Sequence, residues 1–332
     1  MWEKLIGKAR VVLAAAVIGV VAVAAASAAP PSGPSAPTLL ASGIQGGSGS
    51  TVGPGRALYV TEMYAGRISR VDPESGAVTT FASGLPPALF HFGGPVDVAF
   101  IGKTAYVLVT LVSFGPGAVG IYRVDGPSSS TLVADIGAWA LSHPPEVDTG
   151  PLFSPTGNQY ALEAWRGGFL VTDANHNRVL RVTRDGEVSE FFAFDANIVP
   201  TGIEAWGNSV YVALAGPSPH LPQDGKVVKL EPGSPTETEV AAGGQMLVDV
   251  ERGLGSTLYA IGHGAGGPEF FPAPPNTGDL FAVNGDGSFS VLLEDELNQP
   301  MSLEIVKNTA YVVTFGGEVW KIADVSGPPY GG

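Results

Sequence analysis

A strand-containing unit recurs six times along this chain, and this repetition limits the fold more than any other feature of the sequence. Each copy contains a short apolar run with Tyr or Leu in it, at residues 58–60, 105–107, 169–171, 210–212, 258–260 and 310–312. Each run is followed by a segment of alternating side chains, which is typical of a half-buried strand. Turn residues and another strand come next, as in residues 72–82 and 184–193.

A further strand precedes the apolar run in most copies. Residues 200–205 and 300–305 are nearly superposable there, and residues 95–100, 160–165 and 247–251 occupy the same place. Four strands repeated every 41 to 64 residues, with no helical period between them, predict an all-β, six-bladed β-propeller over residues 38–325. Residues 44–55 are so rich in Gly that we expect the first blade's inner strand to be short or irregular.

The ends of the repeat array predict how the ring closes. The last copy ends after its third strand, whereas residues 38–43 repeat the pattern of an outer strand such as residues 80–84. We therefore expect the N-terminal strand (about 38–43) to complete the sixth blade, so that no sheet edge is left open.

The first residues have the layout of a secretory signal peptide. Lys4, Lys8 and Arg10 precede an apolar run from residue 11 to about 26, which ends in Ala-Ser-Ala at residues 26–28. We expect a signal peptide at 1–28, a Pro/Gly/Ser linker at 29–37 and a flexible tail at 326–332. The predicted protein is secreted and monomeric, with no stable membrane insertion once the signal is cleaved. A retained N-terminal membrane anchor is the alternative, because the apolar run reaches the lower limit of spanning length.

Composition excludes several classes of function. The 17 Lys and Arg residues stand against 31 Asp and Glu residues, and a net charge of −14 argues against nucleic acid as a partner. Because the chain has no Cys, it has neither disulfides nor a thiolate nucleophile. The sequence also lacks a phosphate-binding loop, a Gly-x-Ser-x-Gly elbow and a dinucleotide fingerprint.

Loop lengths predict which side of the propeller carries function. In an antiparallel four-strand blade, the link between blades and the link between the second and third strands leave on one side. The long connections all belong to that class, at residues 84–94, 111–118, 137–158, 214–225 and 262–277. Because long loops are usually retained for binding or catalysis, we expect the functional surface there. Their aromatic residues and sparse charge suit a small-molecule, glycan or peptide ligand; the alternative is that they only plug the channel mouth.

Acidic residues recur at matching places of the predicted inner strands. The set comprises Asp97, Glu163, Glu204, Asp249, Glu251 and Glu304. If these carboxylates converge on the channel, a calcium-like divalent cation could compensate their charge, with Asp97, Glu204, Asp249 and Glu304 as candidate ligands. The alternative is structural: each acid accepts hydrogen bonds from backbone amides, or pairs with an Arg, of the neighbouring blade.

Three further residues are candidates for the ligand site. His220 and His263 belong to long loops, and Asp173 follows the apolar run of the third copy. The five His residues of the chain lack the close spacing of a metalloprotease helix, although closure of the ring could bring loop histidines together.

The segment Val-Thr-Asp-Ala-Asn-His-Asn-Arg-Val-Leu-Arg-Val at residues 171–182, followed by Val-Pro-Thr-Gly-Ile-Glu at 199–204, resembles the ScyD/ScyE family of exported bacterial propellers. The likeness extends over nearly all of the chain after the signal, and the family implies no assigned reaction. The first segment is also similar to NHL repeats, a propeller class used mainly for binding. Gluconolactonase-like and virginiamycin-lyase-like propellers are enzymes of similar shape that hold a divalent metal at the channel mouth, through a Glu near the start of the first blade. Here that stretch is the Gly-rich one.

Two functions follow from these observations. The leading hypothesis is a secreted propeller that binds a small or extended ligand on its long-loop face, as an accessory to secondary metabolism or cell-envelope processes. The alternative is a divalent-metal-dependent lyase or lactone hydrolase, with the channel carboxylates as metal ligands or general base.

Overall fold

The computed structural model describes residues 33–150, 153–265 and 272–326. The chain divides into two units, Met1–Pro31 and Ser32–Gly332, and every strand and core cluster described below belongs to the second unit. That unit therefore has a complete core of its own. The predicted signal peptide, linker residues 29–32 and tail residues 327–332 lie outside the described residues.

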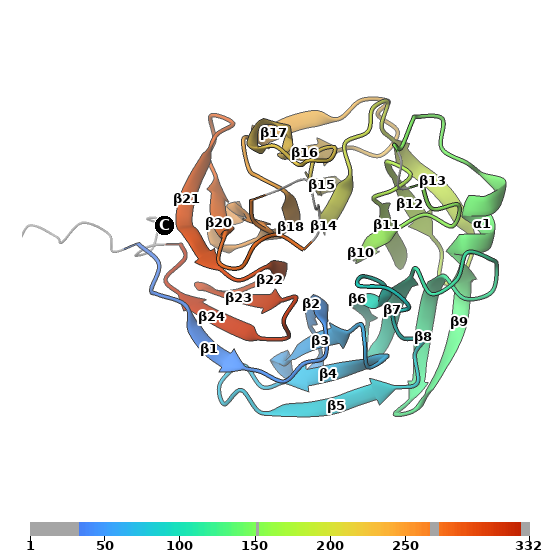
Figure 1. Cartoon of the computed structure of the whole chain (residues 1–332), viewed down its shortest axis with the longest axis horizontal. Helices are drawn as coiled ribbons and strands as arrows, with labels where there is room; N and C mark the ends of the chain where they lie inside the picture. The colour runs from blue at the N-terminus through green and yellow to red at the C-terminus, as the bar shows by residue number, and fades with distance from the viewer. Residues whose placement is uncertain (1–32, 151–152, 266–271, 327–332) are drawn as a thin grey trace, which may run out of the picture. The chain divides into compact units, whose positions relative to one another are not determined.

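Six antiparallel four-stranded sheets are arranged in a ring, which makes the protein a six-bladed β-propeller (Figure 1). Blade 1 comprises β2 (Gly47–Val52), β3 (Leu58–Glu62), β4 (Arg67–Val71) and β5 (Val78–Ser83). Blade 2 comprises β6 (Gly94–Ile101), β7 (Thr104–Thr110), β8 (Gly120–Gly126) and β9 (Ser129–Asp135). Blade 3 comprises β10 (Gln159–Trp165), β11 (Gly168–Asp173), β12 (Arg178–Val182) and β13 (Val188–Ala193).

The second half of the chain repeats this order. Blade 4 comprises β14 (Pro200–Trp206), β15 (Ser209–Leu214), β16 (Lys226–Leu230) and β17 (Thr238–Ala242). Blade 5 comprises β18 (Leu247–Arg252), β19 (Leu258–Gly262), β20 (Gly278–Val283) and β21 (Phe289–Leu297). Blade 6 comprises β22 (Pro300–Val306), β23 (Thr309–Thr314), β24 (Val319–Ala323) and the N-terminal β1 (Thr38–Ala41).

Ring closure occurs as the sequence predicts. Strand β1 pairs antiparallel with β24, with Thr38 opposite Lys321 and Leu39 opposite Trp320. The small side chain of Ala41 is buried in a core cluster that also contains Val319 of blade 6 and Leu58 of blade 1. The first and last parts of the array are thus joined by backbone hydrogen bonds and by a shared core.

The hydrophobic core lies between neighbouring blades. The ring of Tyr106 in blade 2, for example, packs on Phe169 of blade 3 with centroids 4.8 Å apart. Both belong to one buried cluster that includes Leu108 and Leu180. Each sheet packs one face against the preceding blade and the other against the following blade, so the apolar runs recur in every copy.

Each inner strand lies next to the centre of the ring and has a register irregularity near its first residues (Figure 1). Strand β2 shares this irregularity but is six residues long, so the first blade's inner strand is no shorter than that of blade 5. Gly fits in this strand because neighbouring groups leave no room for a side chain. A Cβ on Gly49, for example, would overlap the carboxylate of Asp97.

The strand order places the long connections on one rim, as predicted from their lengths. We call the rim with the connections at residues 84–93, 111–119, 136–158, 215–225 and 263–277 the long-loop rim, and the opposite rim the short-loop rim. One long connection contains a helix that the sequence did not predict, α1 (Ile136–Ser142). Asp135 begins it by accepting a hydrogen bond from the amide of Ala138 at 2.8 Å.

Candidate functional site

Asp97 and Asp249 occupy equivalent places in blades 2 and 5, and both link their blade to the next. One oxygen of Asp97 accepts from the amide of Val98 at 2.8 Å and the other from Leu162 of blade 3 at 2.7 Å. Asp249 repeats this arrangement, accepting from Val250 at 2.9 Å and from Leu303 of blade 6 at 2.8 Å. The carboxylates therefore satisfy amides at the free edge of a neighbouring inner strand, as in the structural alternative stated above.

The backbone of the preceding blade lies directly against this link. A Cβ on Gly202 of blade 4 would come within 3.0 Å of both the Cα and the carboxylate of Asp249. We expect Gly202→Ala to lower the free energy of unfolding by about 2–3 kcal/mol, because the backbone must move to relieve the overlap. Gly285→Ala is the control, since a Cβ there meets nothing within 4 Å. Urea denaturation would test this, and equal stability of the two variants would contradict the close packing.

Four glutamates lie on the inner strands of blades 3 to 6, two positions after the place that Asp97 and Asp249 occupy in their own strands. They are Glu163, Glu204, Glu251 and Glu304. Glu163, Glu251 and Glu304 line a channel cavity of about 50 Å³, together with Asp97 and Asp249. That volume holds a few water molecules rather than a sugar or a peptide side chain.

Burial and mutual repulsion keep these acids from ionising easily. Desolvation raises the pKa of Glu204 to about 7, although Arg252 acts in the opposite direction. Burial also raises the pKa of Glu251 well above its ordinary value, and the neighbouring Glu304 and Glu204 raise it further. Burial also raises the pKa of Glu304, Glu163 and Asp97, and repulsion from neighbouring carboxylates adds to each shift. Burial raises the pKa of Asp249 to about 7.

Tyr160 brings an uncharged polar group into the same cavity. Its hydroxyl is buried and has no hydrogen-bond partner among the described residues. Burial raises its pKa well above the ordinary value, and Asp249 and Asp97 add to the shift. Phe92, from the loop that enters blade 2, stacks on the Tyr160 ring with centroids 5.6 Å apart. An aromatic pair thus connects a long loop to the channel.

The geometry does not fit a divalent cation. Within the described ranges, no three His, Asp or Glu side chains come together as metal ligands would. Asp97 and Asp249, two of the four candidate ligands, use their oxygens to accept hydrogen bonds from backbone amides. The structure therefore supports the structural alternative for these two residues and gives no metal-dependent step.

His220 and His263 lie near each other on the long-loop rim. His263 is fully buried, and its Nδ1 donates to the carbonyl of Pro300 at 2.8 Å. Burial lowers its pKa to about 4, and His220 contributes to the same shift. The Nδ1 of His220 donates to the carbonyl of Gly216 at 2.7 Å, and burial lowers its pKa as well. Both side chains are therefore neutral near pH 7 and are held by backbone carbonyls.

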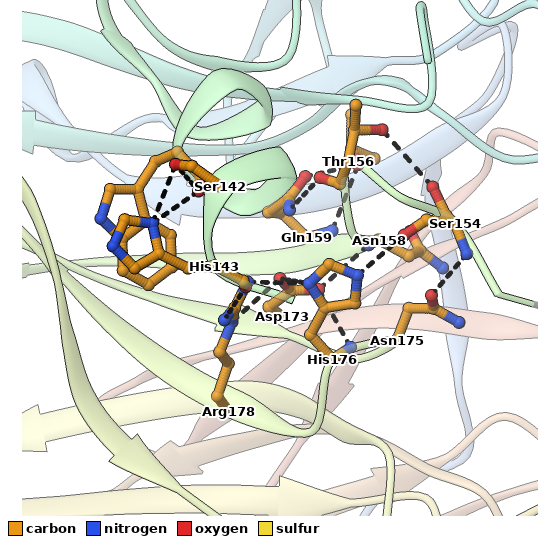
Figure 2. A network of polar contacts seen from close by, with 12 residues as sticks. Ser142, His143, Ser154, Thr156, Asn158, Gln159, Asp173, Asn175, His176 and Arg178 are labelled. Atoms are coloured by element: carbon orange, nitrogen blue, oxygen red, sulfur yellow. Dashed lines mark hydrogen bonds and ion pairs between the residues drawn. The ribbon is translucent and has the colours of Figure 1, made fainter. Parts of the chain in front are cut away.

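Asp173 lies in a buried polar network in blade 3 rather than on a surface (Figure 2). One of its oxygens accepts from the amide of Asn158 at 3.0 Å, and the other lies 3.2 Å from Nδ1 of His176 and 3.5 Å from Nε of Arg178. Burial alone would raise the pKa of Asp173, but His176 and Arg178 outweigh it and the pKa is lowered. Blade 1 repeats the pair, with Glu62 2.8 Å from Arg67.

The network fixes the long loop that precedes blade 3. His176 donates from Nε2 to the carbonyl of Ser154 at 2.8 Å, and Arg178 donates to the carbonyl of His143 at 2.8 Å (Figure 2). Arg178 also lies 4.6 Å from the ring centre of Trp139 in α1. Phe153 stacks on His176 with centroids 5.5 Å apart and is 50% exposed. Asp173 is therefore part of a network whose members contact this loop, and Phe153 of the loop is exposed.

Exposed aromatic side chains gather on the long-loop rim. All exposed Tyr and Phe residues of the described chain belong to it: Tyr64, Phe90, Phe114 and Phe153. Phe90 and Phe114, from different loops, have ring centroids 5.8 Å apart, and exposed Leu89 is next in sequence to Phe90. The Tyr64 hydroxyl donates to the carbonyl of His91 at 2.9 Å, which fixes its position. We call Tyr64, Leu89, Phe90, Phe114 and Phe153 the aromatic surface.

Reasoning from sequence missed parts of this site. Phe114 was not among the candidates, although it lies in a predicted long loop, and Tyr160 was placed only within an inner strand. The exposure of an aromatic side chain in a loop depends on which neighbouring loop covers it, and no pattern along the chain contains that information.

The fold is shared with propellers of known structure. Virginiamycin B lyase from Staphylococcus aureus superposes with a TM-score of 0.52 over 86% of this chain and 98% of that chain, at 14% identity. A gluconolactonase from Xanthomonas campestris gives 0.60 over 88% and 89% at 13% identity. The nidogen/laminin complex gives 0.53 over 78% and 84% at 15% identity. At such identities the likeness establishes the propeller fold and transfers no activity.

No family model matches the sequence, and the curated proteins include no significant match. Among the described residues, no helix is both long and apolar enough to cross a membrane.

Proposed function

We propose that the protein is a secreted propeller that binds a small or extended ligand on its long-loop face and has no chemistry of its own. The observation that carries this proposal is the aromatic surface, where Leu89, Phe90 and Phe114 are 63%, 52% and 55% exposed. Exposed apolar patches of this kind on a soluble protein are typical of binding sites. The inference of export rests on the sequence of residues 1–28.

Charge narrows the chemistry of the ligand. In the described chain, each cation at the long-loop ends of the strands is paired with a carboxylate: Arg67 with Glu62, Arg178 with Asp173 and Lys226 with Glu239. Carboxylates without such partners, including Asp148 and Asp195, are exposed in the loops of this rim. We infer that the ligand is neutral or cationic and amphipathic, such as a peptide, a neutral sugar or another small molecule.

The propeller neighbours include both enzymes and a binding protein, which supports a broad relationship to gluconolactonase-like, streptogramin-lyase and NHL-type propellers. Within that group we assign the chain to exported propellers of the ScyD/ScyE type, on the motif at residues 171–182. An accessory role in secondary metabolism or at the cell envelope is part of this assignment. The metal-dependent lyase or hydrolase is not favoured, because the channel acids do not form a metal site in the described chain.

A thermal-shift screen with neutral oligosaccharides and short cationic amphipathic peptides tests the proposal. A ligand at about 100 times its dissociation constant should stabilise the protein by about 2.7 kcal/mol. That stabilisation should disappear in Phe90→Ser/Phe114→Ser.

The control variant is Val78→Ser/Val291→Ser, which removes exposed apolar side chains from outer strands. It should keep the ligand response. A ligand that stabilises all three proteins equally would place binding elsewhere, and a library without any stabilising member would count against binding on this face.

A further inference from the structure

The positive charges of the propeller are concentrated at the rim opposite to the proposed ligand face. Of the 17 Lys and Arg residues, Lys4, Lys8 and Arg10 precede the described chain, which leaves 14. Eleven of these lie in the turns of the short-loop rim or in the strand ends that lead to it: Arg56, Arg70, Lys103, Arg123, Arg166, Arg181, Arg184, Lys229, Arg252, Lys307 and Lys321. The other three are the paired cations of the long-loop ends.

Within the short-loop rim, charge is sorted by distance from the channel. The turns between first and second strands surround the channel and carry no acid in their described residues. In five of the six blades a cation lies in this turn or is the strand residue directly before it: Arg56, Lys103, Arg166, Arg252 and Lys307. The turns between third and fourth strands, on the outside of the same rim, carry acids that include Asp72, Asp185, Glu231 and Asp286, with Arg184 as the one cation in their described residues. A basic ring around the channel exit is therefore enclosed by an acidic one.

An exposed indole lies inside the basic ring. Trp206, at the end of β14, is 58% exposed, and Leu254 on the next blade is 53% exposed. The guanidinium of Arg252 lies 3.9 Å from the centre of the Trp206 ring. The Nε of Arg252 is buried and makes no hydrogen bond within the described structure. Arg166 of blade 3 donates a hydrogen bond to the side chain of Asn208, which lies in the turn that follows Trp206.

We propose that the basic ring and Trp206 form a second binding site, for an acidic oligosaccharide that carries carboxylate or sulfate groups. A flexible chain can follow Arg56, Lys103 and Lys307 around the channel exit, while a sugar ring packs on the exposed part of Trp206. A flat anionic lipid surface fits less well, because the acidic outer turns would be pressed against it. A peptide made of Asp and Glu would pair with the cations but has no ring to pack on the indole. This site is separate from the one under Proposed function and does not depend on it.

The test uses the propeller unit from Ser32 onwards, which contains the whole core, with oligogalacturonate and heparin-derived oligosaccharides as probes. Binding is measured by calorimetry at low and high salt. We expect Arg56→Gln/Lys103→Gln/Lys307→Gln to weaken binding at least about tenfold. The three side chains are exposed and make no ion pair within the described structure, so their replacement should leave the fold intact. Added salt should weaken wild-type binding strongly.

The matched control is Gln45→Glu/Ala196→Glu/Gln223→Glu, which lowers the net charge by the same amount at exposed positions of the long-loop rim. It should bind both probes within about twofold of the wild type. The added carboxylates lie on the opposite rim, and at about 0.1 M salt charges farther apart than about 10 Å are largely screened from each other. Trp206→Ala should weaken binding about fivefold, through the lost aromatic contact.

The outcomes separate the alternatives. Binding of either probe that depends on the basic ring and Trp206 supports the site. Tighter binding of the heparin-derived chains, which carry sulfates as well as carboxylates, than of oligogalacturonate, which carries carboxylates only, would show that sulfate contributes. An equal loss in the long-loop control would show that net charge alone is responsible, and would overturn it. So would tighter binding to phosphatidylglycerol vesicles or to a poly-glutamate peptide than to both oligosaccharides, and so would failure of both probes to bind.

Discussion

Raising the pH from about 6.5 to about 8.5 is expected to lower the free energy of unfolding by about 3 kcal/mol or more, and the melting temperature by several degrees. The cause is the channel acids. In the folded protein, burial raises the pKa of Glu204 and Asp249 to about 7 and that of Glu251 and Glu304 well above the ordinary value of 4.5. The unfolded chain has already lost these protons at about pH 6.5, whereas the folded protein releases them only as the pH passes the raised pKa values.

The sign follows from proton binding. When folding raises the pKa of an acid, the folded state binds more protons than the unfolded state between the two pKa values. The free energy of unfolding therefore decreases as the pH rises through this window, and the decrease is complete above the folded pKa. His263 has the opposite effect, because its pKa falls from 6.5 to about 4 on folding and its contribution increases with pH across that window. Most of the His263 contribution is reached by about pH 6.5, so above that pH the channel acids dominate the slope.

Glu304→Gln is the informative variant, since it keeps the shape of the side chain and cannot ionise. It should match the wild type near pH 4 and exceed its stability at pH 8.5, as measured by urea denaturation at each pH with chelator present. Parallel profiles for the two proteins, or a wild-type stability that increases up to pH 8.5, would contradict protonated channel acids. If adding calcium restored the stability of the wild type at pH 8.5, a cation rather than protons would neutralise the channel acids.

Much of the architecture is predictable from sequence because the repeat unit encodes it locally. Alternating apolar residues, turn residues and the matching of residues 38–43 to an outer strand each depend on neighbours along the chain. The rim that carries the long loops follows from strand order alone. Helix α1 was missed because seven residues are too few for a helical period to stand out, and its cap, Asp135, ends a strand.

The contacts of the candidate site are less predictable because they join different blades. The matching places of Asp97 and Asp249 are visible in the sequence, but their partners, the amides of Leu162 and Leu303, belong to the next blade. Asp173 was a candidate for binding from its position in the motif, and its burial depends on the loop that covers it. The sorting of charge between the rims was present in the sequence and becomes apparent once strand direction is known.

Removal of β1 is expected to have the largest effect on the fold. A chain that starts at residue 44 lacks the outer strand of blade 6, so β24 becomes an open sheet edge and the cluster around Val319 loses Ala41. We expect it to melt at least roughly 10 °C lower than the chain that starts at residue 32, or to aggregate, as judged by calorimetry and size-exclusion chromatography.

Point variants within β1 distinguish closure from a general effect of truncation. Ala41→Asp places a charge in the core that blades 6 and 1 share, where the side chain is 7% exposed, whereas Leu39→Asp changes a side chain of the same strand that is 52% exposed. The first should cost about 3 kcal/mol or more and the second less than about 1 kcal/mol. If both variants and the shortened chain unfold like the wild type, β1 does not close the ring. The blades would then be held by their cores alone, and the N-terminal strand would be dispensable.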